Sequence, residues 1–176
     1  MEEKIVSSRQ IYNGRIVRLQ VHEVELPDGR RSVREVIEHP GAVAIVPLDS
    51  DNHVFLVRQY RIAAGQVTLE IPAGTLEPDE PPLTCAEREL QEEIGYRADT
   101  LTAMGGFYVA AGYTTEYIHL FQGTDLVKSS LPQDDDEFIE VVRLSFAQAL
   151  TMIESGEIID SKTIIGLLRI PRNSDL

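Results

Sequence analysis

Cysteine is almost absent from this sequence, which has one, Cys85, among its 176 residues. A single cysteine excludes an internal disulfide and is typical of a reducing compartment. Long apolar runs are also missing, since none approaches the roughly 18 residues that a membrane-spanning helix needs. The N-terminal segment MEEKIVSSRQ lacks the apolar stretch of a signal peptide. We therefore expect a cytoplasmic protein with no membrane partner, in which Cys85 is a small packing residue rather than a reactive thiol.

Basic residues are scarce as well. The chain carries 16 Lys and Arg against 29 Asp and Glu, which gives a formal net charge of −13. Such a surface repels the phosphate backbone of nucleic acids, so a polynucleotide partner is disfavoured. The same charge repels a small phosphate ester. An acidic protein that handles phosphates therefore needs local compensation, either by arginines or by a divalent cation.

The order of predicted elements favours a single α/β structural unit with a mixed β-sheet packed in layers with helices. The turn signal Pro27-Asp28-Gly29 predicts a hairpin over residues 15–39, and 42–48 is a continuous apolar run of strand length. Further strands are predicted at 53–60, 67–71, 101–110, 116–122 and 137–144, and helices at 81–94, 146–154 and 161–170. The strand order does not follow from these patterns.

The first predicted helix has clear boundaries. Pro81-Pro82 suits a first helical turn, because the missing proline N–H is not needed there, and Gly95 suits the position just past the last turn. An apolar stripe at helical spacing should face the core, and it consists of Leu83, Ala86, Leu90 and Ile94.

Acidic residues gather on another side of the same helix. Glu89, Glu92 and Glu93 are three or four positions apart, so they share one side, and Arg88 lies one turn before Glu92 and can pair with it. Like charges at this spacing destabilise a helix, and Mg²⁺ would offset the cost because it prefers carboxylate oxygens and joins them to substrate phosphates. A solvated glutamate-rich surface is the alternative reading.

The segment 74–96, GTLEPDEPPLTCAERELQEEIGY, resembles the Nudix box, G-x5-E-x7-R-E-U-x-E-E-x-G-U with U apolar. Tyr96 at the last apolar position is a mild departure. The matching residues are Gly74, Glu80, Arg88, Glu89, Leu90, Glu92, Glu93 and Gly95. The resemblance implies a Nudix fold, with a mixed β-sheet sandwiched between helices, and a Nudix pyrophosphohydrolase activity.

The resemblance also implies roles for individual residues. Mg²⁺, with Mn²⁺ as a possible substitute, would bind the carboxylates of the box together with the backbone carbonyl of Ala73, and Glu116 on a later loop would orient the attacking water. The implied catalytic residues are Glu116, Glu93 and Glu89, and the implied metal ligands are Ala73, Glu89, Glu92, Glu93 and Glu116. Structural support of the box is implied for Gly74, Glu80, Arg88 and Gly95. A solvated loop position is the alternative for Glu116.

Segments outside the box resemble the ADP-ribose branch of the family, the nucleoside diphosphate sugar hydrolases. In VRQYR, Arg61 matches a phosphate-contacting position, while Arg34 and Glu38 in VREVIEHPGAV match a segment that holds the nucleoside. Arg58 is a further candidate substrate-binding residue, and solvated ion pairs are the alternative for all three arginines. ADP-ribose, cleaved to AMP and ribose 5-phosphate, is the expected substrate, although Ala111 replaces a proline usual in that branch.

The same branch implies an organisation in which residues 1–40 form an N-terminal strand and hairpin region that dimerises, and residues 41–176 form the catalytic domain. A homodimer is therefore expected. Alternatives of the same class are hydrolysis of GDP-mannose, a dinucleoside polyphosphate or an oxidised nucleoside triphosphate. A non-catalytic nucleotide sensor is another alternative, as is a Ca²⁺-binding structural protein. The run Asp134-Asp135-Asp136-Glu137 is either a second metal site or a solvated turn.

Overall fold

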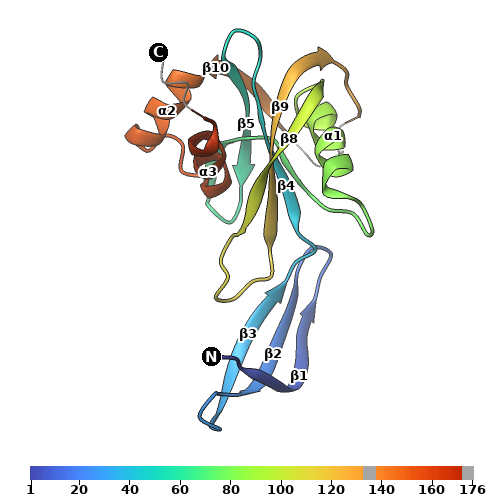
Figure 1. Ribbon diagram of the computed structural model, residues 1–176, viewed down its shortest axis with the longest axis vertical. Helices are drawn as coiled ribbons and strands as arrows, with labels where there is room; N and C mark the ends of the chain where they lie inside the picture. The colour runs from blue at the N-terminus through green and yellow to red at the C-terminus, as the bar shows by residue number, and fades with distance from the viewer. Residues whose placement is uncertain (133–137, 172–176) are drawn as a thin grey trace. The chain divides into compact units, whose positions relative to one another are not determined.

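The computed structural model describes residues 1–132 and 138–171. Contacts divide the chain into two compact units. The first consists of Met1–Gly41 and Tyr108–Tyr117, and the second of Ala42–Phe107 and Ile118–Leu176. Each unit is built around its own β-structure (Figure 1).

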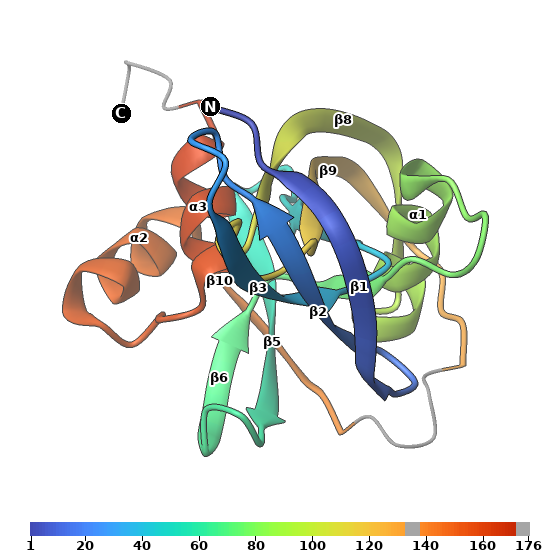
Figure 2. The same ribbon diagram turned by 90° about the horizontal axis from the view of Figure 1, so that it is seen from below.

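The first unit is a three-stranded antiparallel sheet in the order β1-β2-β3. Its strands are β1 (Lys4–Asn13), β2 (Arg18–Glu25) and β3 (Arg31–Glu38), which lie next to one another in Figure 2. The predicted hairpin is confirmed, since β2 pairs with β3 across a turn in which Gly29 has φ 85°. The sequence pattern did not indicate bounds for strand β1, because irregular pairing between Ile5 and Ser7 and between Gln10 and Tyr12 disrupts the alternation that identifies a strand.

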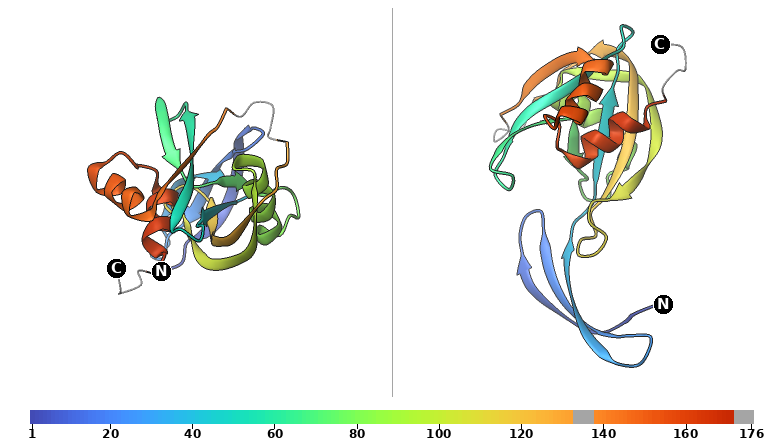
Figure 3. Two further views of the ribbon diagram at one scale, coloured as in Figure 1. Left: turned by 90° about the horizontal axis from the view of Figure 1, so that it is seen from above. Right: turned by 90° about the vertical axis from the view of Figure 1, so that its left-hand side faces the viewer.

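In its described residues, the second unit contains two sheets and three helices. The sheet β10-β5-β6 is antiparallel, and the sheet β7-β4-β9-β8 is mixed because β4 runs parallel to β9. The strands are β4 (Ala42–Pro47), β5 (His53–Arg61), β6 (Gln66–Glu70), β7 (Ala73–Thr75), β8 (Tyr96–Tyr108), β9 (Tyr117–Lys128) and β10 (Glu140–Ser145). The helices are α1 (Pro82–Glu93), α2 (Phe146–Ser155) and α3 (Ser161–Arg169). Figure 3 shows α1 on one side of the sheets and α2 with α3 on the other, which is the layered α/β arrangement that the sequence predicted.

Strand β4 lies between two hydrophobic clusters, and all six of its residues are buried. Val43 and Ile45 pack with Cys85 and Leu90 of α1, while the alternate residues of β4 pack with α2 and α3. Since successive side chains of a strand point to opposite faces, a strand covered on both faces must be apolar throughout. This explains the uninterrupted apolar run in the sequence.

The ends of the helices agree with the predicted signals, but one core assignment is wrong. Gly95 follows α1 with φ 74°, and Gly156 follows α2 with φ 79°. Leu83 is exposed, because the first buried residues of α1 are Cys85 and Ala86. Among residues 1–132 and 138–171, no helix has the length and apolar character needed to cross a membrane.

Candidate active site

Helix α1 carries two carboxylates on its buried face. Glu89 is 7% exposed and Glu93 is 2% exposed, whereas Glu87 on the same helix is exposed. Burial of a carboxylate is unfavourable unless other groups compensate for its charge. Two buried glutamates one helical turn apart are therefore not the solvated surface that a glutamate-rich helix face usually forms.

The short strand β7 leaves space for one of these carboxylates at a position without a side chain. A Cβ atom built on Gly74 would overlap the carboxylate of Glu89. The φ of Gly74 is not in the left-handed region, so the glycine is required here by close approach and not by backbone conformation. The carboxylate of Glu89 can therefore occupy its position only because residue 74 has no side chain.

We expect Gly74→Ala to push the Glu89 carboxylate out of place and to lower turnover by about 100-fold, because misplacement of a catalytic group by about 1 Å has effects of that size. The turnover of Gly74→Ala is measured by steady-state hydrolysis with Mg²⁺. The control is Gly112→Ala, since a Cβ at Gly112 would meet nothing within 4 Å. Near-normal turnover of Gly74→Ala would show that the position of Glu89 is not critical.

Glu93 lies against the backbone at the start of β7. Its Oε2 accepts a hydrogen bond from the Ala73 N–H at 3.1 Å, which joins the end of α1 to the entry of the box. The carboxylate of Glu93 and the main chain of Ala73 are therefore held together. The hydrogen bond thus brings together two residues that the resemblance implies as cation ligands.

Arg88 joins the acids of the box. Its Nε and Nη2 donate to Glu80 at 3.0 and 3.1 Å, and its Nη1 donates to Glu89 at 2.7 Å and to Glu92 at 2.8 Å. The hydrogen bond from Arg88, against the effect of burial, lowers the pKa of Glu80 to about 2. The same contact raises the pKa of Arg88. Burial raises the pKa of the neighbouring Cys85 thiol, which is therefore a packing group and not a nucleophile.

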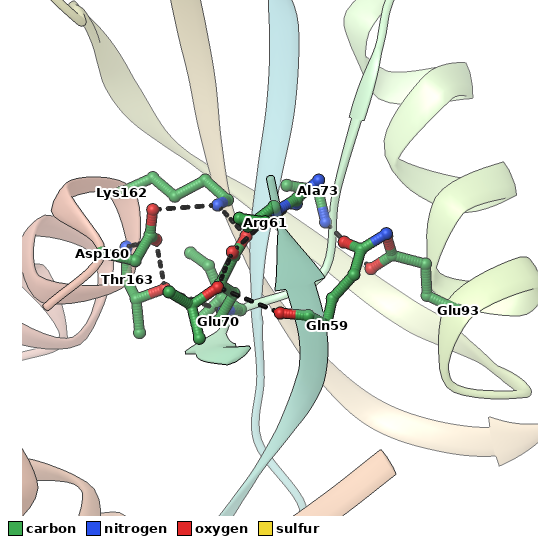
Figure 4. A network of polar contacts seen from close by, with 10 residues as sticks. Gln59, Arg61, Glu70, Ala73, Glu93, Asp160, Lys162 and Thr163 are labelled. Atoms are coloured by element: carbon green, nitrogen blue, oxygen red, sulfur yellow. Dashed lines mark hydrogen bonds and ion pairs between the residues drawn. The ribbon is translucent and has the colours of Figure 1, made fainter. Parts of the chain in front are cut away.

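A second charged cluster lies around Glu70, which is 2% exposed (Figure 4). Arg61 donates to Glu70 through Nε at 2.8 Å and Nη2 at 2.7 Å, and Thr68 donates at 2.6 Å. Lys162 of α3 also pairs with this carboxylate. Burial opposes ionisation of Glu70, but these contacts together lower its pKa to about 2. Arg61, expected to contact phosphate, is thus held by Glu70 in this structure.

Helix α3 is tied to the same region by its N-terminus. Asp160 accepts from the Thr163 N–H at 2.9 Å, and the Thr163 hydroxyl accepts from the Ile71 N–H at 2.9 Å. Sequence reasoning missed Glu70, Lys162 and Thr163. A charged residue inside the apolar stretch 67–71 could have drawn attention to Glu70, but its partner on α3 is remote in sequence.

The other predicted substrate-binding residues make local ion pairs or hydrogen bonds. Arg58 donates to Glu140 at 3.2 Å in the second unit. In the first unit, Arg34 donates through Nε to Glu3 at 3.0 Å, and Glu38 accepts from Gln20 at 3.4 Å.

Glu116 also belongs to the first unit. The loop before it is held on β3, where Ile37 N–H donates to the Tyr113 carbonyl at 2.8 Å and Thr115 N–H donates to the Ile37 carbonyl at 2.9 Å. The N–H of Glu116 donates to the Thr114 hydroxyl at 3.1 Å. The acidic run Asp134–Glu137 lies outside the described residues.

The donor set fits a hard divalent cation, although it is not preassembled. Within the described ranges, no three acidic, cysteine or histidine side chains are grouped closely enough to hold a metal ion. The fit rests on Glu89 and Glu93, both buried, on the Ala73 backbone beside Glu93, and on the space left by Gly74. The guanidinium of Arg88 compensates part of the negative charge.

The family models match almost the whole chain. The NUDIX domain matches residues 38–164, and the nucleoside diphosphate sugar hydrolase N-terminal domain matches residues 3–37. With the helix of buried glutamates and the layered fold already described, this match shows that the chain belongs to the Nudix family. The chain is a Nudix pyrophosphohydrolase by that membership.

Relatives and a solved structure agree with the family. An ADP-ribose pyrophosphatase from Bacillus subtilis is 40% identical over 165 residues, covering 93% of this chain and 89% of its own. A methanol dehydrogenase activator from Bacillus methanolicus is 41% identical over 168 residues, covering 94% and 91%. A GDP-mannose pyrophosphatase from Klebsiella pneumoniae is 33% identical, covering 100% and 92%. The crystal structure of an ADP compounds hydrolase superposes with a TM-score of 0.86 at 26% identity, covering 97% and 92%.

Proposed function

We propose that this protein uses Mg²⁺, or Mn²⁺ in its place, to hydrolyse the pyrophosphate bond of ADP-ribose to AMP and ribose 5-phosphate. The buried pair Glu89 and Glu93, seated against Gly74 and Ala73, is the observation that carries the proposal. Relatives called ADP-ribose pyrophosphatase support the choice of substrate. A related nucleoside diphosphate sugar is the runner-up, supported by the relatives called GDP-mannose pyrophosphatase. The intact box disfavours a non-catalytic sensor.

Glu89, Glu92, Glu93 and the carbonyl of Ala73 would hold the cation. When bound, it would screen the charge of the diphosphate, lower the pKa of a coordinated water and stabilise the departing phosphate. Arg88 keeps Glu89 and Glu92 oriented through its two hydrogen bonds from Nη1. Glu80 holds Arg88 from the other side, which fixes the loop before α1 to the helix.

Arg61, Arg34, Glu38 and Arg58 are the proposed substrate contacts. Glu70 engages Nε and Nη2 of Arg61, so Nη1 is the nitrogen that this carboxylate does not use. A guanidinium held on one edge is preorganised for a phosphate oxygen on the other, and Arg suits such contacts. For Arg34, the proposed role requires exchange of its present partner, Glu3, for the nucleoside.

Glu116 is proposed to orient and deprotonate the attacking water. Because a positioned general base contributes about 10²–10⁴-fold, we expect Glu116→Gln to lower turnover by about 10³-fold at saturating Mg²⁺. The control is Glu35→Gln, an exposed residue of the same unit. Near-normal turnover of Glu116→Gln at neutral pH would remove Glu116 from this role.

We also propose a homodimer formed through residues 1–40. Val24 is the one buried apolar residue of that segment, whereas Ile5, Ile11, Tyr12 and Val33 are 46–63% exposed. These exposed side chains lie on both faces of the sheet, since Ile5 pairs with Val24 and Val33 pairs with the next residue of β2, Glu23. A small sheet is stabilised when an apolar face is covered, so a second copy of the same sheet is the proposed cover for one of the faces. A cytoplasmic location remains a prediction from the sequence.

Sedimentation of the full chain at micromolar concentration is expected to give the mass of a dimer. The double variant Ile5→Glu/Ile11→Glu should give the monomer mass, because two buried charges are placed in each half of the contact. Ile62→Glu, at an 88% exposed position of the second unit, should leave the dimer intact. A monomeric and fully active native protein would contradict the proposal.

The substrate is tested with a panel of ADP-ribose, GDP-mannose, a dinucleoside polyphosphate and an oxidised nucleoside triphosphate, each with Mg²⁺ in H₂¹⁸O. ADP-ribose should have the highest kcat/KM and yield AMP and ribose 5-phosphate, and the labelled product identifies the attacked phosphorus. A higher kcat/KM for GDP-mannose would move the assignment to the runner-up. Failure to cleave any of the four would overturn the proposed function.

A further inference from the structure

The side-chain oxygen Oε1 of Gln59 on β5 is buried and has no hydrogen-bond partner, and it is the single such side-chain atom in the described part of the chain. Buried polar atoms are nearly always paired, and an exception calls for an explanation such as a water molecule or an ion. An unpaired buried acceptor destabilises the fold, so we expect the oxygen of Gln59 to accept a hydrogen bond in another state of the protein.

Strand geometry directs Gln59 to the side of the box helix. Val57, Gln59 and Arg61 alternate along β5 and so share one face. Val57 packs with Cys85 and Leu90 of α1. Arg61 lies at the other end of this face. Its pKa is raised first by its hydrogen bond with Glu70, against burial, and further by the negative charge of Glu93.

Gln59 lies between Val57 and Arg61 on this face, so it faces the end of α1 that carries Glu93. Figure 4 shows the Gln59 side chain pointing toward Glu93 and Ala73. The amide oxygen and the carboxylate of Glu93 are both acceptors, so neither can satisfy the other. The amide oxygen of Gln59 therefore needs a hydrogen-bond donor, and the waters that Mg²⁺ retains on binding to protein carboxylates are such donors.

We propose that Gln59 is a positioning residue whose amide oxygen accepts a hydrogen bond from a water on the cation held by Glu89, Glu93 and Ala73. The inference rests on the proposed function, because it needs a cation at that site. Residues that bond to metal ligands or metal-bound waters in this way orient them, and their loss commonly weakens metal affinity by about 10–100-fold.

Gln59→Met tests the proposal, since it keeps the length of the side chain and removes the amide. Mn²⁺ affinity is measured by calorimetric titration of the full chain without substrate, and the thermal midpoint is measured in EDTA. The two readouts should move in opposite directions. Mn²⁺ should bind about tenfold more weakly, while the Tm without metal should rise by about 2 °C because an unpaired buried acceptor is gone. A merely structural role would instead lower the Tm.

Gln59→Glu restores an acceptor and should bring the Mn²⁺ affinity back to the native value or tighter. The matched control is Gln66→Met, an exposed glutamine on β6, which should change neither readout. Native Mn²⁺ affinity in Gln59→Met, with binding still lost in Glu93→Gln, would overturn the role of Gln59 and leave the metal site intact. Absence of Mn²⁺ binding by the native chain would instead overturn the proposed function, and this inference with it.

Discussion

Glu93→Gln should lower turnover of ADP-ribose by about 10³-fold or more while the protein stays folded. The substitution removes a buried negative charge from the proposed cation site, and the charge stabilisation that a bound metal ion supplies is worth several kcal/mol. The amide oxygen of glutamine can still accept the hydrogen bond from the Ala73 N–H, so the link between α1 and β7 is kept. The measurement is kcat at saturating Mg²⁺, with the thermal midpoint as the check on folding.

The control for Glu93→Gln comes from the same helix. Glu87 is an exposed glutamate of α1, and Glu87→Gln should leave turnover within about twofold, since exposed substitutions away from special contacts have small effects. If both variants kept native turnover, the buried carboxylates of α1 would be structural residues and the catalytic proposal would be wrong. If both lost activity equally, a general loss of charge would explain the result better.

Glu70→Gln should destabilise the fold by about 3–5 kcal/mol at neutral pH, the cost of breaking a buried ion pair by removing one partner. Glu70 pairs with Arg61 at 2.7 Å and also with Lys162, whose side chain is 12% exposed, so the substitution leaves two cations around a neutral amide. The measurement is urea unfolding. The control is Glu140→Gln, which breaks an exposed pair with Arg58 and should cost about 0–1 kcal/mol.

The Glu70 prediction has a definite pH dependence. The pKa of Glu70 is lowered from 4.5 to about 2, since the contacts with Arg61 and Lys162 outweigh burial. A lowered carboxylate pKa gives stability that is fully present above about pH 4.5 and is lost as the pH falls toward 2. The stability difference between the native protein and Glu70→Gln should therefore shrink across that window. A difference that is constant from pH 7 to pH 2.5 would show that the charge of Glu70 is not the cause.

The parts of the fold that follow strict local rules were predictable from the sequence. The apolar run of β4 required burial on both faces, and Gly95 marked the end of α1. The bounds of β1 were not predicted because its irregular pairing disrupts alternation. Leu83 was assigned to the core because helical spacing alone does not fix where the buried face begins.

Contacts of the candidate site between residues close in sequence were predictable, whereas contacts between residues far apart in sequence were not. The spacing within residues 74–96 places Glu89, Glu92 and Glu93 near Arg88, and the Arg88–Glu92 contact is present. By contrast, the pairing of Glu70 with Lys162 joins positions on β6 and α3 that only the tertiary fold brings together. The unpaired oxygen of Gln59 depends on the packing of β5 against α1, which a single sequence does not contain.

The central claim is that buried carboxylates on α1 bind a divalent cation that acts on a diphosphate. Hydrolysis of ADP-ribose by the purified full chain, followed against free Mg²⁺ and then in excess EDTA, tests it most directly. Release of AMP and ribose 5-phosphate should saturate with Mg²⁺, stop on chelation and return when Mg²⁺ is restored. Turnover that continues unchanged in EDTA would contradict it.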